Sequence, residues 1–148
     1  MSLKKSIQIN QIEAMKAGQK NRLSALRTLF SDIRNKEIDL KIEISDDEII
    51  MLIKKNIKVL EESFELYKQA DKEETAQEIK EQISVLREYL PPDLTDEEII
   101  DSIKKIAQEN KDAIQTNPKA IIKLAMNDLR SKTDSSRVMK ALKELSFV

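Results

Sequence analysis

Apolar residues recur at three- and four-residue steps through most of the 148-residue chain, which is the spacing of one face of an α-helix. Val, Thr and aromatic residues are too sparse for a sheet protein. We therefore expect an all-α fold with about seven helices. The predicted helices run over about 2–17 and 20–39, from Ser45 to a turn near 71–74, from that turn to Leu90, and then after Thr95, Asn117 and Asp134.

Within each predicted helix, the apolar stripe marks the face that we expect to be buried. In the fourth helix, steps of three, four, three and four residues form a narrow seam that suits an antiparallel partner. The expected inward residues are Ile7, Ile12 and Met15 in the first helix; Leu23, Leu26, Phe30, Ile33 and Glu37 or Ile38 in the second; Ile49, Ile53, Ile57, Leu60, Phe64 and Tyr67 in the third; Ala76, Ile79, Ile83, Leu86 and Leu90 in the fourth; Ile99, Ile103 and Ile106 in the fifth; Ile121, Ile122, Ala125 and Leu129 in the sixth; and Val138, Leu142 and Leu145 in the seventh.

Capping residues mark the helix ends. Ser45 and Thr95 are each followed three residues later by glutamate, which is the capping-box pattern of a helix start. Gly18 suits the left-handed position that follows a helix end. The pair Asn117–Pro118 predicts an N-cap with proline in the first helical position, and Asp134 is expected to cap the last helix.

A helix cannot continue through Pro91 and Pro92, because proline lacks an N–H and its ring clashes with the preceding turn. We therefore expect two lobes joined by a stiff hinge: an N-terminal four-helix lobe over 1–91 and a small C-terminal three-helix lobe over 92–148. Tyr89 has two interpretations. It is a site residue at the hinge, or it is a packing anchor whose hydroxyl lies at the rim.

The composition excludes several kinds of chemistry. No cysteine and no histidine are present, which rules out disulfides, thiol nucleophiles, Cys/His zinc sites and imidazole acid–base catalysis. A Mg²⁺ site made of carboxylates alone is compatible with the composition, but no acidic cluster has a distinctive spacing, so no metal site and no cofactor are predicted. The apolar runs are too short to span a membrane, and Lys4 and Lys5 are not followed by the apolar region of a signal peptide, so a cytoplasmic monomer is expected.

The net charge of −1 conceals three blocks of opposite sign: +5 over residues 1–42, −10 over 43–109 and +5 over 118–143. Such asymmetry concerns binding partners rather than the fold. The last block is either a solvated face or a surface that binds RNA phosphates weakly and with steep salt dependence. No aromatic residue is available within it for base stacking. The candidate nucleic-acid-binding residues are Lys119, Lys123, Arg130, Lys132, Arg137 and Lys140, of which Lys123, Arg130 and Arg137 are expected on solvated faces.

Arg22, Arg27 and Arg34 in the second helix also have two interpretations. They are ion-pair partners of the acidic middle of the chain, or they form a second phosphate-binding surface. The acidic face of residues 61–101 is in turn either a recruiting surface for a basic partner or a solvated face.

Further short motifs are spread over nearly the whole chain: Met15–Ala17, Arg22–Arg27, Ile33–Ile38, Glu62–Glu65, and Leu86–Pro91 followed by Leu94–Glu98. Taken together and in order, they resemble the YqeY family, whose fold is related to the helical and tail domains of the GatB subunit of the glutamine-dependent aminoacyl-tRNA amidotransferase. The resemblance implies a larger N-terminal and a small C-terminal helical lobe. It also implies an association with carbon–nitrogen ligase (amidotransferase) activity and a C-terminal lobe that contacts tRNA.

The C-terminal lobe departs from the usual family pattern. Where the family has Met-Gly-x-x-Met and then Gly-x-Ala-Asp-Gly, this chain has Pro118–Ile122 and Ser131–Ser135, in which only Asp134 of the second motif remains. The family's glycines are therefore absent here, although the positive charge of the lobe is kept.

Two hypotheses about function follow. The first is a noncatalytic accessory of tRNA-dependent amidation or of related tRNA handling, which the resemblance and the basic C-terminal lobe favour. The second is a protein-interaction or scaffold module without a nucleic-acid role, which the missing glycines and the net charge of −1 favour. Amide transfer by this chain is disfavoured, because it has no cysteine, no glycine-rich phosphate loop and no recognisable Ser–Lys arrangement.

Overall fold

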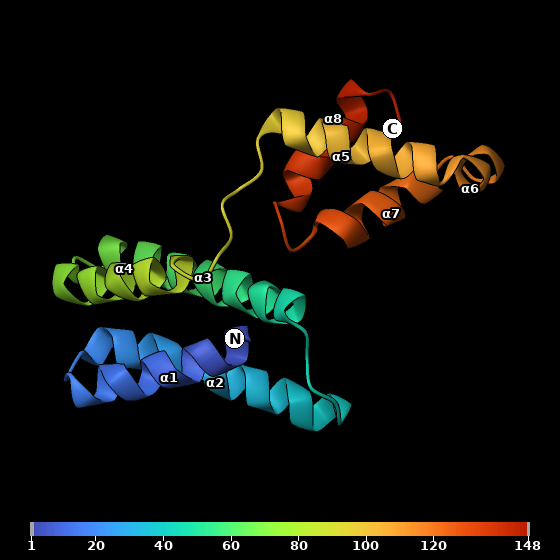
Figure 1. The fold of residues 1–148 in the computed structure, drawn as a ribbon. Coiled ribbons are helices and arrows are strands. Elements are labelled where there is room, and N and C mark those ends of the chain that lie inside the picture. Colours follow the sequence, from blue (N-terminus) through green and yellow to red (C-terminus); the bar gives the residue numbers. More distant parts are fainter. Residues whose placement is uncertain (1, 148) are drawn as a thin grey trace. The chain divides into compact units, whose positions relative to one another are not determined.

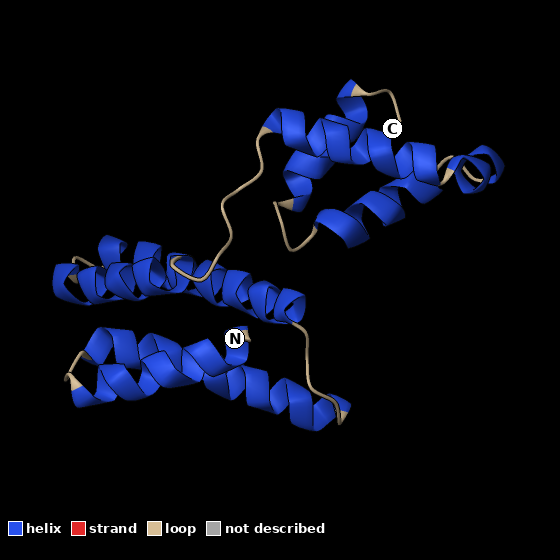
Figure 2. Ribbon diagram, in the orientation of Figure 1, coloured by secondary structure: helices blue, strands red, loops and turns tan. Residues whose placement is uncertain are grey.

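The computed structural model describes residues 2–147, and these contain helices, turns and loops but no strand (Figures 1 and 2). The all-α prediction is therefore confirmed. Eight helices occur in this part of the chain: α1 (Leu3–Lys16), α2 (Lys20–Leu40), α3 (Asp46–Gln69), α4 (Glu73–Arg87), α5 (Asp96–Glu109), α6 (Lys111–Thr116), α7 (Ala120–Leu129) and α8 (Ser135–Glu144).

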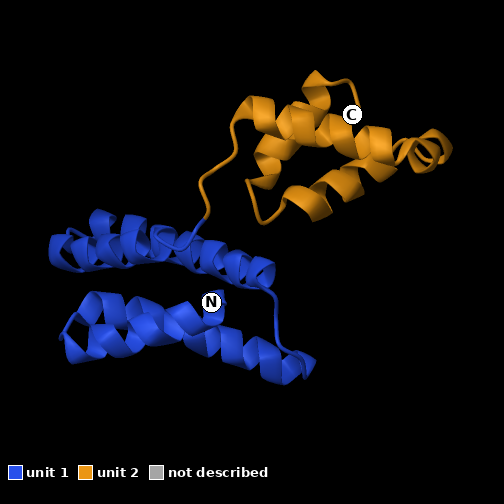
Figure 3. Ribbon diagram, in the orientation of Figure 1, with its two compact units in different colours: residues 1–90 blue, residues 91–148 orange. Residues whose placement is uncertain are grey.

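The chain divides into two compact units, which Figure 3 shows in separate colours. The N-terminal unit covers residues 1–90 and holds α1–α4, whereas the C-terminal unit covers residues 91–148 and holds α5–α8. Each unit has its own cluster of buried apolar residues. Each unit therefore has its own source of hydrophobic stabilisation.

Two helical hairpins stack in the N-terminal unit (Figure 1). α1 and α2 are joined at Gly18, whose φ of +69° is the left-handed conformation that the sequence predicted. α3 and α4 are joined at 70–72, close to the predicted turn, and Asp71 there has a φ of +58°. The fully buried core of this unit consists of Ile7, Leu26, Leu29, Ile33, Ile49, Ile53 and Leu86.

Four residues that were expected in the core are exposed instead, of which Tyr67 of α3 is the least exposed at 37%. Ile12 and Met15 keep 44% and 53% of their surface accessible, and Ile38 keeps 67%. α1 buries Ile7 and Ala14, which are seven residues apart, so its contact face is a heptad seam that leaves positions 12 and 15 outside. Ile38 lies five residues beyond the last buried residue of α2, which is about 140° around the helix from that face.

Glu37 connects three segments of the N-terminal unit. Its carboxylate accepts a hydrogen bond from Lys4 Nζ at 2.6 Å and another from the backbone N–H of Ile44 at 3.1 Å. Its side chain is only 13% exposed. The hydrogen bond from Lys4 is the main reason that the pKa of Glu37 lies below its ordinary value of 4.5.

Replacing Glu37 with glutamine is expected to destabilise the N-terminal unit by about 1–2 kcal/mol at pH 7, because a charged hydrogen-bonded acceptor is lost. A carboxylate whose pKa is lowered by folding contributes stability above its unfolded pKa, and that contribution is lost as the pH falls through the folded value. The difference from the wild type should therefore shrink below pH 4.5. Urea denaturation at pH 7 and pH 3.5 measures this, with Glu43→Gln as the exposed control; equal differences at both pH values would contradict the ion-pair origin.

Two of the four predicted caps are confirmed by side-chain hydrogen bonds. Ser45 Oγ accepts the Glu48 N–H at 3.3 Å at the start of α3, and Thr95 Oγ1 accepts the Glu98 N–H at 3.1 Å at the start of α5. Asp134 precedes α8 as predicted, but its backbone carbonyl, and not its side chain, accepts from the N–H groups three and four residues later.

The C-terminal unit holds one helix more than the predicted three. α6 is six residues long, and half-buried Ile114 is its only large apolar residue, so it has no apolar period to detect. Asn117 follows it, and Asn117 Oδ1 accepts the Lys119 N–H at 3.3 Å. α7 then begins at Ala120, so Pro118 lies in the turn before the helix and not in its first position.

The predicted apolar stripes of the other three helices form the core of this unit. α5, α7 and α8 pack against one another, and α6 contacts α5 and α7. The buried residues that the sequence predicted are Ile99, Ile103, Ile106, Ile121, Ala125, Leu129, Val138 and Leu142.

Candidate nucleic-acid interface

The six cations proposed from the sequence lie in the C-terminal unit, on α7, on α8 and in the turn between them. Lys119 and Arg130 flank α7 with helical backbone angles, so the helical path extends by one residue at each end. Lys123 and Arg130 are seven residues apart, about two turns, and therefore lie on the same side of α7. Lys119, Lys123, Arg130 and Lys132 are all exposed.

Few carboxylates lie near these α7 cations in the sequence. Lys119, Lys123 and Lys132 form no ion pair with another residue that the structure describes. Asp128 is the one carboxylate on α7, and it lies about 140° around the helix from Lys123. We name Lys119, Lys123, Arg130 and Lys132 the α7 surface.

The turn from α7 to α8 has a polar interior. Ser131 and Thr133 are 5% and 2% exposed, whereas Lys132 between them is exposed. Thr133 Oγ1 accepts a hydrogen bond from Arg137 Nη1 at 3.3 Å. Inward hydroxyl side chains and an outward cation thus occupy a turn in which the family pattern described above has glycine.

Arg137 is half-exposed on α8, and its charge is paired with carboxylates. Its guanidinium contacts Asp93 Oδ2 at 3.0 Å and Asp96 Oδ1 at 2.8 Å, and its side chain is 30% exposed. The hydrogen bond with Asp96 is the largest cause that raises the pKa of Arg137, and it also lowers the pKa of the Asp96 carboxyl. Lys140, almost one turn further along α8, lowers the pKa of Asp96 through its charge.

The proposed cations therefore fall into two groups with different surroundings. The α7 surface presents its positive charge to solvent, whereas Arg137 and Lys140 on α8 lie beside carboxylates at the start of α5. A polyanion that approached α8 would have to displace Asp93 and Asp96 and would be repelled by them. Of the two groups, the α7 surface is electrostatically the more accessible to phosphate.

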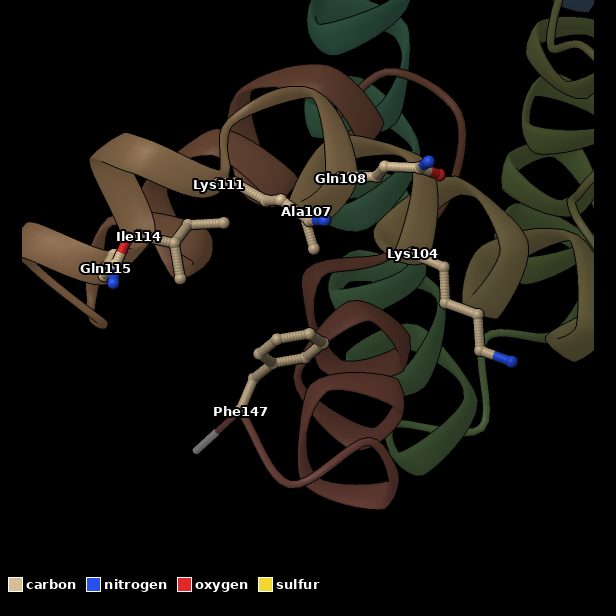
Figure 4. Close-up of a pocket in the computed structure, with 7 residues that line it drawn as sticks. All are labelled: Lys104, Ala107, Gln108, Lys111, Ile114, Gln115 and Phe147. Atoms are coloured by element: carbon tan, nitrogen blue, oxygen red, sulfur yellow. The ribbon is translucent and has the colours of Figure 1, made fainter.

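An open hollow of about 520 Å³ lies elsewhere in this unit, and the sequence did not indicate it. Figure 4 shows the ring of Phe147 opposite Ala107 and Ile114, while the amine of Lys104 points away from the ring. Phe147 is half-buried and packs against the C-terminal core. The only available sequence signal was the spacing of residues 104, 108, 111 and 115 along one face of consecutive helices.

The hinge residues are placed as follows. Tyr89 packs against the N-terminal core, and its hydroxyl accepts a hydrogen bond from Asn10 Nδ2 at 2.6 Å. This contact supports the interpretation of Tyr89 as a packing anchor. Pro91 and Pro92 are exposed and lie outside any helix.

The three arginines of α2 divide between the two interpretations. Arg22 forms the predicted ion pair with the acidic middle of the chain: its Nη2 lies 2.8 Å from Glu88 Oε2, and this bond raises the pKa of the arginine. Arg27 and Arg34 are exposed and form no ion pair within residues 2–147. The ion-pair prediction is thus confirmed for Arg22 alone.

The described residues offer neither a metal site nor a membrane-spanning helix. No group of three or more Asp or Glu side chains is arranged to hold a metal ion in this part of the chain. No described helix combines the length and the apolar character that crossing a membrane requires.

Comparison with known proteins identifies relatives of the sequence. The family of Yqey-like proteins matches residues 4–145. An uncharacterised protein of Schizosaccharomyces pombe, C22F3.15, is 30% identical over 80 residues, which is 54% of this chain and 65% of that protein. The match therefore spans slightly less than two thirds of the relative.

Proposed function

We propose that this chain, which belongs to the YqeY-like protein family, is a noncatalytic helical module that associates with tRNA through phosphate contacts of its C-terminal unit. In this proposal it is an accessory of tRNA-dependent amidation or of related tRNA handling. The observation that carries the proposal is the exposed α7 surface, three of whose four cations have no ion-pair partner among the described residues.

The chemistry of the α7 surface suits phosphates better than bases. Lysine and arginine that neutralise phosphates release counterions, which favours binding without regard to sequence. The aromatic ring of this unit, Phe147, is not part of the α7 surface, so stacking on bases does not contribute there. The carboxylates of Asp96, Glu97 and Glu98 at the start of α5 are exposed and repel a polyanion, which keeps the affinity weak.

The residues of the chain also argue for binding rather than catalysis. With no cysteine and no histidine, the chain lacks the usual nucleophile and the usual general base of group transfer. Arg137 and Asp96, the charged groups with shifted pKa values in this unit, are bound to each other. Their shifts are explained by structural ion pairing without a reaction.

Bulk tRNA should bind to the full chain weakly and with steep salt dependence. Phosphate contacts by the three lysines of the α7 surface predict that the association constant falls roughly fortyfold between 50 and 200 mM monovalent salt, because each contact contributes a log–log slope near −0.9. Fluorescence anisotropy with labelled tRNA measures this slope. Binding that persists in high salt, or a strong preference for one tRNA, would contradict phosphate recognition, and no binding at 20 mM salt would remove the tRNA proposal.

The second candidate is a protein-interaction module, and one observation favours it. Val59 and Leu66 on α3 are 53% and 67% exposed, and they lie seven residues apart on one side of the helix, with Tyr67 beside them at 37%. Exposed apolar side chains in such a row are typical of a contact with another protein. This candidate predicts that tRNA retention stays at background in low salt, so the same titration separates the two.

A further inference from the structure

The tertiary structure sorts the cations of α2 and its C-cap into two groups. Arg22 is bound to Glu88 beyond the end of α4, and Lys36 is bound to Glu48 of α3 at 2.8 Å. These two cations are therefore neutralised within the bundle. The remaining four are exposed and form no ion pair within the described residues: Lys20, Arg27, Arg34 and Lys41.

The four exposed cations, which we name the α2 row, stand at seven-residue steps. Seven residues advance a helix by about 10.5 Å and bring the side chain to within about 20° of its starting direction. Lys20, Arg27 and Arg34 therefore form a straight line along α2, and Lys41 continues it to a length of about 30 Å. Leu29 in the core lies about 160° around the helix from Arg27, so the line faces solvent.

The face around the α2 row is rich in hydrogen-bond donors, and the carboxylate beside it is Glu37, whose pKa is lowered mainly by Lys4 and also by the charge of Arg34. Glu37 is turned to Lys4, and Asp32 and Asp39 lie about 120° or more around the helix from Arg27. Large exposed aliphatic residues gather at the C-terminal end of the row, where Ile38, Leu40 and Ile42 lie close to Lys41. The exposed polar residues beside the row are Ser24, Thr28, Ser31 and Asn35.

The end of the row opens into a hollow. Lys4, Arg34 and Lys41 line a space of about 440 Å³, together with Glu37, Ile38, Ile42 and Glu43. Lys41 ends α2 with a φ of +57°, a left-handed conformation that is unfavourable for a residue with a Cβ and is usually taken by glycine. At this helix end glycine would adopt the backbone conformation at lower cost, whereas the lysine adds a cation to the row.

We propose that the α2 row binds the phosphodiester backbone of a nucleic acid, as a second contact surface that lies in the N-terminal unit. Cations interleaved with hydroxyl and amide donors are the side chains that contact phosphate and sugar oxygens. No large exposed aliphatic residue lies between Lys20 and Arg34, so most of the row lacks the apolar surface on which an amphipathic helix of another protein docks. The proposal does not depend on the α7 surface. It gives a function to Arg27 and Arg34, which form no ion pair within the described residues.

The test compares charge reversal on the α2 row with matched changes elsewhere in the same unit. Arg27→Glu/Arg34→Glu in the full chain is expected to lower the affinity for labelled tRNA at least tenfold at 50 mM salt and to flatten the salt slope. Arg27→Lys/Arg34→Lys should bind within about threefold of the wild type, because phosphate recognition needs charge rather than the guanidinium shape. The control, Lys58→Glu/Lys80→Glu, changes two exposed lysines of α3 and α4 by the same total charge and should bind like the wild type.

The same variants are also tested for binding to duplex DNA and to phosphatidylserine vesicles, which present phosphate groups from other sources. A loss on DNA that exceeds the loss on tRNA assigns the row to DNA backbone, whereas a loss on tRNA assigns it to RNA. Equal binding by Arg27→Glu/Arg34→Glu and the wild type overturns the proposal, and so does a loss that is confined to the vesicles. Failure of the α7 surface is distinguishable, because it would leave binding unchanged in Lys119→Glu/Lys123→Glu/Lys132→Glu while the loss in Arg27→Glu/Arg34→Glu stays in place. Circular dichroism of each variant confirms that the helices persist.

Discussion

Replacing Lys119, Lys123 and Lys132 together with glutamate is expected to lower the affinity of the chain for tRNA roughly a hundredfold at 50 mM salt. Each exposed cation near a phosphate contributes on the order of 1 kcal/mol, so three of them account for about 3 kcal/mol, and each 1.4 kcal/mol is tenfold. Reversal of sign adds repulsion to this loss. Folding should be retained, because all three side chains are exposed and none pairs with a described carboxylate.

A matched control is available in the same unit. Lys104, Lys105 and Lys111 on α5 and α6 are also exposed, and their replacement by glutamate gives the same net charge. The affinity of this control for tRNA should fall less than tenfold, since its lysines are not on the α7 surface. Equal losses in both triple variants would show that net charge, and not the α7 surface, determines binding. Arg137 is left out of the variant, because its replacement would also remove the contacts with Asp93 and Asp96.

Replacing Ile103 with aspartate is expected to unfold the C-terminal unit while the N-terminal unit stays folded. Ile103 is fully buried in α5, and a carboxylate there would have no partner; the lost apolar contacts and the desolvated charge together cost more than about 6 kcal/mol. A unit of residues 91–148 has a stability of only about 6 kcal/mol at 0.1 kcal/mol per residue. The buried residues of the N-terminal core do not include any residue of α5.

Limited proteolysis and circular dichroism measure the outcome. The variant should lose the helical signal of α5–α8, and protease should leave a resistant fragment close to residues 1–90. Lys104→Asp places the same carboxylate on the neighbouring exposed position and should behave like the wild type. Loss of both units in the Ile103→Asp variant would show that the two units depend on each other for folding.

Local sequence features determined most of the secondary structure. The steps of Ile99, Ile103 and Ile106 predicted α5 because helical periodicity is a property of neighbouring residues, and these three are buried as expected. The cap at Thr95 and the left-handed Gly18 were predictable for the same reason, since each depends on bonds within a few residues. α6 escaped prediction because a helix of six residues carries too few apolar positions to show a period.

Burial was predicted less well than helicity, because a stripe indicates a face but not the partner that covers it. Ile12 lies on an apolar stripe of α1, yet the seam through Ile7 and Ala14 is the one that contacts other helices. Ile38 fits a four- or five-residue step from Ile33 in the sequence, but α2 presents it to solvent. These choices depend on how α1–α4 pack, which local periodicity does not contain.

The sequence by itself determined which residue types the chain can use for function: many lysines and arginines, no cysteine and no histidine. Only the tertiary structure decided which cations face a carboxylate and which face solvent. Arg137 meets Asp96, 41 residues away in the chain, and Arg22 meets Glu88, 66 residues away, whereas Arg27 and Lys123 remain exposed. The physical reason is that an ion pair depends on the distance between two charged groups in space. Residues this far apart in the sequence come within 4 Å of each other only when the chain folds and its segments pack together.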